Sequence, residues 1–286
     1  MRKKTLSGSR RSLILLAGLA AFSAETPVLG QSPTTVTALV PAYFYPTWWS
    51  GSPWDDLTRA ASRIPLEAIM NPASGPGTAP NADYERAVAD LRMAGGKVIG
   101  YVATGYGARP LGAILGEIDA YLAWYAVDGI FVDEMGNQLG SVDYQAIYDY
   151  VKGLQAVLGR ELRVVGNPGI PFPQVEVFLS AADTLVIFEG PLSTSDPQGA
   201  SFRAYPTRGP YAGMPLWFLN DPRQRFANLV YAAPSARALG SLLDKAIRFN
   251  AGYVYITNDV LPNPWDSLPS YWNLEVDAIA ARNAGR

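Results

Sequence analysis

Three carboxylates stand directly after apolar runs in this sequence. Ile130-Phe-Val leads into Asp133 and Glu134, and Leu185-Val-Ile-Phe leads into Glu189. Two carboxylates held at different pKa values can divide the roles of general acid and nucleophile or base. With about 5–5.5 Å between them such a pair suits a retaining glycosidase, and with about 6.5–9.5 Å an inverting one. These residue types therefore favour carboxylate chemistry on a glycosidic bond, with the stereochemical outcome left open.

The chain of 286 residues contains no histidine and no cysteine. The first absence excludes a Ser-His-Asp triad, a His-ligated zinc ion and an imidazole base. The second excludes disulfides and thiolate chemistry. Acid–base work is left to Asp, Glu, Lys or Tyr, and we expect no cofactor and no metal. Two other interpretations of the carboxylates stay open: a purely structural pairing with Arg109 or Arg203, and an Mg²⁺ or Ca²⁺ site.

Short apolar runs alternate with helical patterns after Thr34. Strands are expected at 38–44, 67–71, 97–103, 129–133, 163–167, 184–189, 216–220 and 253–257. Helices are expected at 82–94 and 144–158, each stopping at glycine, and in two pieces broken near Pro234 within 223–249. Eight strands with intervening helices in about 250 residues predict the α/β class and one (β/α)₈ TIM barrel spanning 35–283. A doubly wound sheet is the alternative, but no glycine-rich phosphate loop supports it.

A barrel of this kind builds its site at the carboxyl ends of its strands. Because side chains alternate along a strand, only one of Asp133 and Glu134 can face the barrel axis. Carboxylates from strands four and six can then face each other across a sugar ring, whereas Asp128 precedes its strand and belongs to the opposite end. Other polar or aromatic residues at or after strand ends form the expected substrate-binding set: Tyr43, Tyr45, Trp48, Asn71, Tyr101, Tyr106, Asn167, Asn220 and Asn258.

Some of these residues have a competing interpretation. Asn71, Asn167, Asp221 and Asp259 could simply cap helices or complete turns. Among the aromatic residues, we expect Trp48, Trp49 and Trp54 to be exposed beside the site, and Trp265 to lie near it after strand eight. Trp124 and Trp217 are expected in the core. A rim of aromatic faces, which stack on pyranose rings, indicates a glycan cleft.

The first thirty residues have the pattern of a secretory signal. Basic residues precede the apolar run 13–22, which is too short to span a bilayer. A retained anchor is the alternative, and the pair Arg10-Arg11 loosely fits twin-arginine export. Cleavage after residue 30 would remove five positive charges and one negative charge and change the formal net charge from −2 to −6. We therefore expect a secreted or periplasmic monomer with no basic surface for nucleic acid and no stable membrane insertion.

Several motifs resemble the spherulin 4 family, also called spherulation-specific family 4. They are Val40-Pro-Ala-Tyr-Phe-Tyr-Pro46, Ile69-Met-Asn-Pro-Ala-Ser-Gly-Pro-Gly77, Gly100-Tyr-Val-Ala-Thr-Gly-Tyr-Gly-Ala-Arg109, Trp124-Tyr-Ala-Val-Asp-Gly-Ile-Phe-Val-Asp-Glu134 and Asn167-Pro-Gly169. The resemblance implies a (β/α)₈ glycoside hydrolase that cleaves α-1,4-linked N-acetylgalactosamine within an exopolysaccharide, either a galactosaminogalactan or a Pel-like biofilm glycan. It places the acidic site residues at Asp133, Glu134 and Glu189.

We assign Asp133 as nucleophile and Glu189 as general acid/base, with the exchange of these two roles left open. Glu134 would orient a substrate hydroxyl or amide group, or tune the pKa of its neighbour. The alternative function is a non-catalytic glycan-binding or matrix protein that uses the same aromatic cleft. A polysaccharide deacetylase is nearly excluded, because that chemistry usually needs a histidine-rich metal site.

Overall fold

The structure, a computed structural model, describes residues 35–47, 51–136, 142–169, 175–195 and 199–285. The expected signal segment 1–30 and the expected site residue Trp48 lie outside the described residues. All described residues belong to one compact unit, Pro33–Arg286. Within them, no helix combines the length and the apolar character that crossing a membrane requires.

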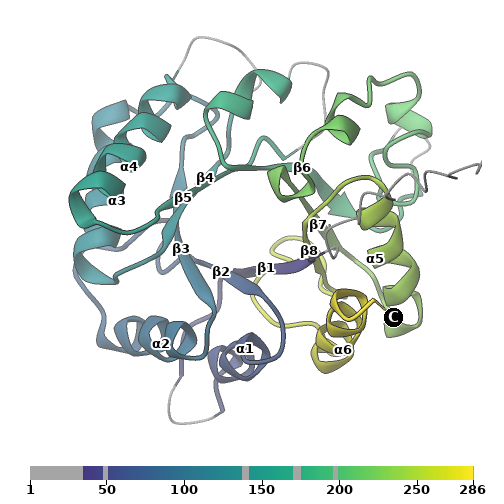
Figure 1. Ribbon diagram of the computed structural model, residues 1–286, viewed down its shortest axis with the longest axis horizontal. Coiled ribbons are helices and arrows are strands. Elements are labelled where there is room, and N and C mark those ends of the chain that lie inside the picture. The colour runs from purple at the N-terminus through teal and green to yellow at the C-terminus, as the bar shows by residue number, and fades with distance from the viewer. Residues whose placement is uncertain (1–34, 48–50, 137–141, 170–174, 196–198, 286) are drawn as a thin grey trace, which may run out of the picture. The chain divides into compact units, whose positions relative to one another are not determined.

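Eight parallel strands close into a barrel in which each strand pairs with its sequence neighbour and β8 pairs with β1 (Figure 1). The TIM-barrel prediction is therefore confirmed. The strands are β1 Thr37–Ala42, β2 Leu66–Met70, β3 Lys97–Ala103, β4 Gly129–Asp133, β5 Arg163–Gly166, β6 Thr184–Pro191, β7 Phe226–Tyr231 and β8 Tyr253–Ile256. Their residues are almost all buried, because the barrel core covers one face and the outer helices cover the other.

The α-helices lie outside the strands (Figure 1). They are α1 Pro53–Ala61, α2 Ala82–Met93, α3 Leu111–Trp124, α4 Tyr144–Leu158, α5 Leu239–Arg248 and α6 Trp272–Asn283. The expected helices at 82–94 and 144–158 are confirmed, and α4 ends where Gly159 takes a left-handed φ of 64°. Short 3₁₀ turns complete the connections: η1 Val175–Ser180, η2 Gly209–Tyr211, η3 Trp217–Asn220, η4 Arg223–Arg225 and η5 Ala236–Ala238.

Strand seven was predicted wrongly. The run 216–220 forms the turn η3, and β7 is Phe226–Tyr231, inside the stretch expected to be helical. Phe226, Leu229 and Val230 have the i, i+3, i+4 spacing of a helix face, so periodicity alone could not exclude a helix. Phe218 of η3 is buried with its ring 5.9 Å from that of Phe226. This short aromatic turn therefore packs against the strand for which it was mistaken.

The Asp-Gly-Ile-Phe motif has a structural reason for its glycine. A Cβ atom on Gly129 would lie 2.2 Å from the carbonyl oxygen of Arg163, so only glycine lets β4 pair this closely with β5. Asp128, one residue earlier, accepts hydrogen bonds from Val98 N and from Arg92 Nε. Its predicted place at the amino ends of the strands is confirmed. The motif thus anchors β4 at one end and delivers Asp133 at the other.

A fully buried carboxylate, Glu275 of α6, supports the end of β8. Its Oε1 accepts a hydrogen bond of 2.9 Å from Ile256 N, whereas its Oε2 is buried without a partner. Burial raises the pKa of Glu275 to about 8. Because this pKa in the folded state exceeds the ordinary value of 4.5, the contribution of Glu275 to stability is fully present below about pH 4.5 and is lost as the pH rises toward 8.

We expect Glu275→Gln to become more stable relative to the wild type as the pH rises. The amide keeps an oxygen for Ile256 N and carries no charge to bury. Between pH 5 and pH 8 the difference in unfolding free energy should grow by about 1–3 kcal/mol, measured by urea denaturation. Glu161→Gln, at an exposed carboxylate, is the matched control and should show a flat difference. A flat difference for Glu275→Gln as well would contradict the burial argument.

Candidate active site

Asn167 joins the two carboxylates that sequence reasoning placed on strands four and six. Its side-chain nitrogen Nδ2 donates to Asp133 Oδ1 at 2.8 Å and to Glu189 Oε2 at 2.7 Å. Its Oδ1 accepts from Gly169 N at 2.8 Å, which closes the Asn-Pro-Gly turn after β5. One amide group of Asn167 therefore completes the predicted turn and also contacts both predicted acids.

The shared nitrogen limits the distance between the two carboxylates. Two oxygens that lie 2.8 and 2.7 Å from one atom can be no more than 5.5 Å apart, the sum of those distances. This limit on one pair of oxygens favours the closer carboxylate separation of about 5–5.5 Å that suits a retaining glycosidase. The two acids are held near each other through β5, the strand between them.

The two carboxylates have different electrostatic surroundings. Burial, followed by the negative charge of Asp133, raises the pKa of Glu189 to about 7. Burial also raises the pKa of Asp133, but hydrogen bonds from Glu134 N, Tyr101 and Asn167 favour its charged form. At neutral pH, Glu189 can therefore hold a proton, while the hydrogen bonds to Asp133 favour its ionised form. This is the asymmetry that an acid and a nucleophile require.

Glu134 follows the last residue of β4 and does not share the amide of Asn167 with this pair. Its backbone takes a left-handed φ of 52°, which is unfavourable for a non-glycine residue. Its Oε2 accepts a 3.1 Å hydrogen bond from Gly105 N, and its carbonyl oxygen accepts a 2.6 Å hydrogen bond from the Thr104 hydroxyl. Glu134 is therefore held against the β3–α3 loop.

Three predicted tyrosines lie around the carboxylates. Tyr43 and Tyr101 pack edge to face with ring centroids 5.6 Å apart. Burial, followed by the charge of Asp133, raises the pKa of both hydroxyls. Tyr106 is 72% exposed in the β3–α3 loop, and after partial burial it is the charges of Glu134, Asp133 and Glu189 that raise its pKa. An open phenol ring therefore stands close to all three acids.

Two aromatic residues complete the neighbourhood of Glu189. Trp265 in the loop after β8 hydrogen-bonds the Glu189 side chain, and its ring packs edge to face on Tyr231 at 6.0 Å. The charge of Glu189 also contributes to a raised pKa of Tyr231, after burial. Tyr231 was missed because strand seven was misplaced. It ends the true β7, so the strand-end rule applied to the run 226–231 would have found it.

Four other predicted residues serve local structure instead. Tyr45 donates to Asp83 Oδ2 at 2.6 Å. Asn71 Oδ1 accepts from Gly75 N within its own loop, and Asn258 Oδ1 accepts from Ser270 N. Asn220 is exposed in η3, and no strand ends there. Neighbouring Phe218 O and Asp221 O accept from Asn250, which lies between α5 and the amino end of β8, so Asn220 lies at the barrel end opposite the carboxylates.

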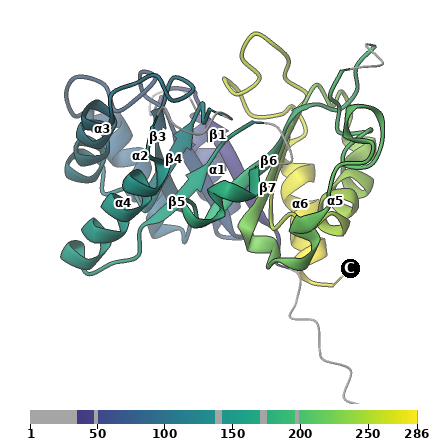
Figure 2. The ribbon, with the colours of Figure 1, turned by 90° about the horizontal axis from the view of Figure 1, so that it is seen from above.

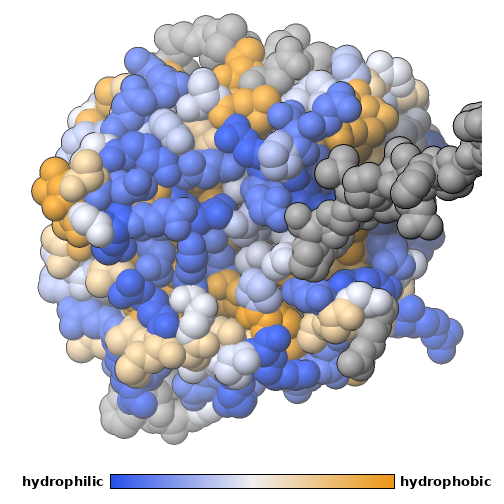
Figure 3. Space-filling view, viewed as in Figure 1, coloured by the Kyte–Doolittle hydropathy of each residue, from blue (hydrophilic) through white to orange (hydrophobic). Residues whose placement is uncertain are grey.

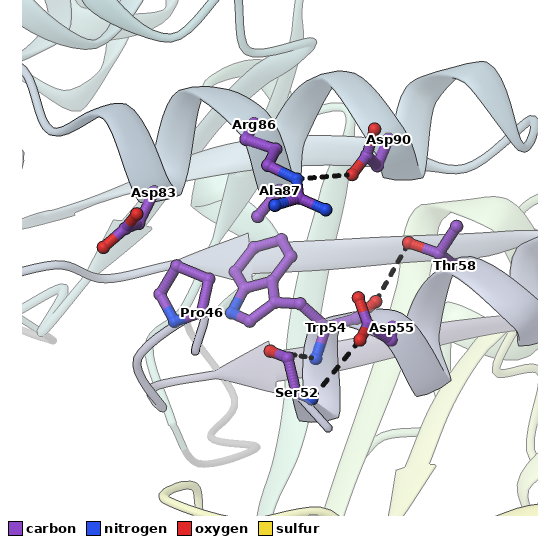
Figure 4. A pocket seen from close by; sticks show the side chains of 9 residues that line it. All are labelled: Pro46, Ser52, Trp54, Asp55, Thr58, Asp83, Arg86, Ala87 and Asp90. Atoms are coloured by element: carbon purple, nitrogen blue, oxygen red, sulfur yellow. Dashed lines mark hydrogen bonds and ion pairs between the residues drawn. The ribbon is translucent and has the colours of Figure 1, made fainter. Parts of the chain in front are cut away.

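Trp54 is also corrected. It was expected to be exposed beside the site, but it is only 2% exposed and its Nε1 donates to Phe44 O at 3.0 Å. Figure 4 shows its indole between α1 and α2, beneath a small pocket where Arg86 reaches toward Asp90. Trp124 and Trp217 are half-buried against the core, as expected. Trp54 therefore belongs to helix packing.

The two arginines that were considered as structural partners, Arg109 and Arg203, do not pair with the site carboxylates. Arg109 pairs with Glu117 at 2.5 Å, and Arg203 makes no ion pair within the described chain. No group of three or more Asp and Glu side chains among the described residues is arranged to hold a metal ion. Asp133 and Glu189 instead accept hydrogen bonds from uncharged donors, and neither carboxylate makes an ion pair with a described residue.

Comparison with known proteins gives a consistent set of matches. The model of spherulation-specific family 4 matches residues 37–279. Spherulin-4 of Physarum polycephalum is 28% identical over 262 residues, which cover 90% of this chain and 74% of that protein. The crystal structure of Aspergillus clavatus Sph3 in complex with GalNAc superposes with a TM-score of 0.66 and 25% identity, covering 86% of this chain and 98% of that one.

A second solved structure extends the likeness in fold. A GH18 chitinase from Pseudoalteromonas aurantia superposes with a TM-score of 0.53 and 12% identity, covering 87% of this chain and 99% of that chain. At this identity the likeness is one of fold. The barrel described here is thus shared with a protein named for glycoside hydrolysis, and the arrangement of carboxylates must carry any statement about chemistry.

Proposed function

Because this chain belongs to spherulation-specific family 4, we propose that it is a retaining glycoside hydrolase whose nucleophile is Asp133 and whose general acid/base is Glu189. The observation that carries the proposal is the pair of carboxylates joined by Asn167. The two oxygens that share its amide nitrogen lie no more than 5.5 Å apart, and the pKa of Glu189 is raised to about 7. Buried acids with raised pKa values cluster at catalytic sites, which favours hydrolysis over glycan binding alone.

The substrate we propose is an α-1,4-linked N-acetylgalactosamine polymer, cleaved within the chain. The GalNAc bound in the matched Aspergillus clavatus structure supports this choice of sugar. In an α-linked 2-acetamido sugar the acetamido group lies on the same face as the leaving group, so it cannot attack from the opposite face. An enzyme carboxylate must then supply the nucleophile, which Asp133 does.

The reaction proceeds in two displacements. Glu189 gives its proton to the glycosidic oxygen while Asp133 attacks the anomeric carbon, so the glycosidic bond breaks and a glycosyl ester forms. Glu189, now a carboxylate, takes a proton from water as that water attacks the anomeric carbon and releases Asp133. Tyr101 and Asn167 hold Asp133 by hydrogen bonds. Tyr106 offers an exposed ring on which a sugar can stack.

Export is part of the proposal, on the basis of the amino-terminal sequence, because an exopolysaccharide lies outside the cell. The protein is expected to act there as a monomer without a cofactor.

The test is a reducing-end assay on an α-1,4-GalNAc polymer, with the product anomer followed by NMR from the start of the reaction. We expect new reducing ends, oligosaccharide products of several sizes, and α-anomers first. Products of β-configuration would contradict the retaining mechanism. Retention of the polymer without new reducing ends would favour the alternative, a glycan-binding protein.

A further inference from the structure

Ion pairs between basic side chains and carboxylates are distributed unevenly along the described chain. Every described lysine and arginine before residue 203, and also Arg282, lies within ion-pair distance of a carboxylate. Those from 203 to 248 make no ion pair with a described residue: Arg203, Arg208, Arg223, Arg225, Arg237, Lys245 and Arg248. The acidic total charge predicted no basic surface for nucleic acid, and this stretch adds a local excess of unpaired positive charge to that picture.

Four of these residues form what we call the α5 basic cluster: Arg203, Arg208, Lys245 and Arg248. Lys245 Nζ donates to Arg203 O at 2.9 Å and stands 5.3 Å above the centre of the Phe202 ring. Burial, followed by the positive charges of Arg208 and Arg248, lowers the pKa of Lys245 to about 8. Lys245 and Arg248 also lie three residues apart in the last turn of α5, and so on one face of that helix. The arginines of the cluster are exposed.

The cluster has no counterion of its own among the described residues. Asp244, next to Lys245 in sequence, pairs with Arg282 at 2.7 Å. Like charges held together raise the free energy of the folded chain, and an anion bound among them would relieve that cost. Exposed guanidinium groups suit carboxylates, because their paired N–H donors match the two carboxylate oxygens.

None of the four cations makes a hydrogen bond or ion pair with Asp133 or Glu189, although Arg203 and Arg208 lie in the segment between β6 and β7. Lys245 and Arg248 lie in the last turn of α5, which leads directly into the amino end of β8. Asp133 and Glu189 stand at the carboxyl ends of β4 and β6. Figure 2 shows α5 on the outside of the barrel. On the face drawn in Figure 3, hydrophobic residues occur only in small separate groups among hydrophilic ones. An anion could therefore bind the cluster without entering the active site.

We propose that the α5 basic cluster is a docking surface for an acidic polysaccharide, one that carries carboxylates on its sugars. Several exposed cations spread over two segments suit the repeated charges of a polymer. The ring beneath Lys245, Phe202, is buried, so the cluster offers no aromatic platform for the bases of a single-stranded nucleic acid. Bound there, the polymer would hold the enzyme in a matrix while the carboxylate site stays open to its substrate.

The test uses polygalacturonate as the probe and the full chain as the protein. Wild-type protein should bind it by isothermal titration at low salt, with an affinity that falls as salt is added. The double variant Arg208→Glu with Arg248→Glu should lose about tenfold or more in affinity, as expected when two charge contacts turn repulsive. The matched control is the double variant Arg59→Glu with Arg86→Glu, which makes the same charge change at exposed arginines that already pair with carboxylates. This control should bind polygalacturonate as the wild type does.

Three outcomes would overturn the proposal. They are no binding of polygalacturonate by the wild type, an equal loss in the control, and an equal or higher affinity for duplex DNA at the same salt. The reducing-end activity of both double variants should equal that of the wild type, because neither touches the carboxylate site. Loss of docking with unchanged hydrolysis therefore separates this inference from the proposed function.

Discussion

Asp133→Asn should lose hydrolysis of the α-1,4-GalNAc polymer by about 10³–10⁴-fold or more in kcat. The amide cannot form the glycosyl ester, but it keeps an oxygen that can accept the hydrogen bond from Asn167 Nδ2. Because burial raises the pKa of Asp133 and so disfavours its charge, the neutral variant should unfold at an equal or higher temperature than the wild type. A reducing-end assay and a thermal melt measure the two effects.

The control for this variant lies in the same segment. Asp128→Asn makes the identical change at the amino end of β4, where Asp128 binds Val98 N and pairs with Arg92. We expect that variant to lose stability and to keep its kcat. Near wild-type activity of Asp133→Asn would refute the assignment of the nucleophile.

Glu189 should set the alkaline limit of the reaction. The general acid must be protonated in the free enzyme, so kcat/KM should fall about tenfold per pH unit above a pH near 7, where Glu189 titrates. On the acid side, kcat/KM should fall as Asp133 takes up a proton, at a pH above the ordinary range of Asp because burial raises its pKa. Initial rates across this range at low substrate concentration measure both limbs.

Glu189→Gln should remove the alkaline limb and lower kcat on the polymer by about 10²–10⁴-fold. A substrate with an activated aryl leaving group needs no proton from the enzyme, so this variant should still form the glycosyl ester from it quickly, whereas Asp133→Asn should not. If the activated substrate rescued Asp133→Asn and left Glu189→Gln inactive, the two roles would be exchanged.

Much of the barrel could be predicted because a parallel strand that is buried on both faces appears in the sequence as a short, continuous apolar run. The strand β4 and the helix α4 were predicted with the observed bounds. Strand seven could not be located in this way, since Trp217-Phe-Leu and Phe226–Tyr231 are both short apolar runs. Which of them joins the sheet depends on contacts with β6 and β8, which are far apart in sequence.

The candidate site was likewise predictable only in part from the sequence. The strand-end rule identified Asp133, Glu189 and Asn167 separately, because a residue type and its position in the chain are local properties. The rule also selected Asn220, and it failed there because no strand ends at that residue. It missed Tyr231 for the same reason.

The sequence by itself determined that any acid–base chemistry is left to Asp, Glu, Lys or Tyr, since the chain has no histidine or cysteine, and that three carboxylates follow buried strands. Only the tertiary structure decided how these carboxylates lie relative to one another. Closure of the barrel brings β4, β5 and β6 side by side, so that one amide of Asn167 reaches both acids. Burial there raises the pKa of Glu189 to about 7. Distance and desolvation depend on residues remote in sequence, and no local pattern encodes them.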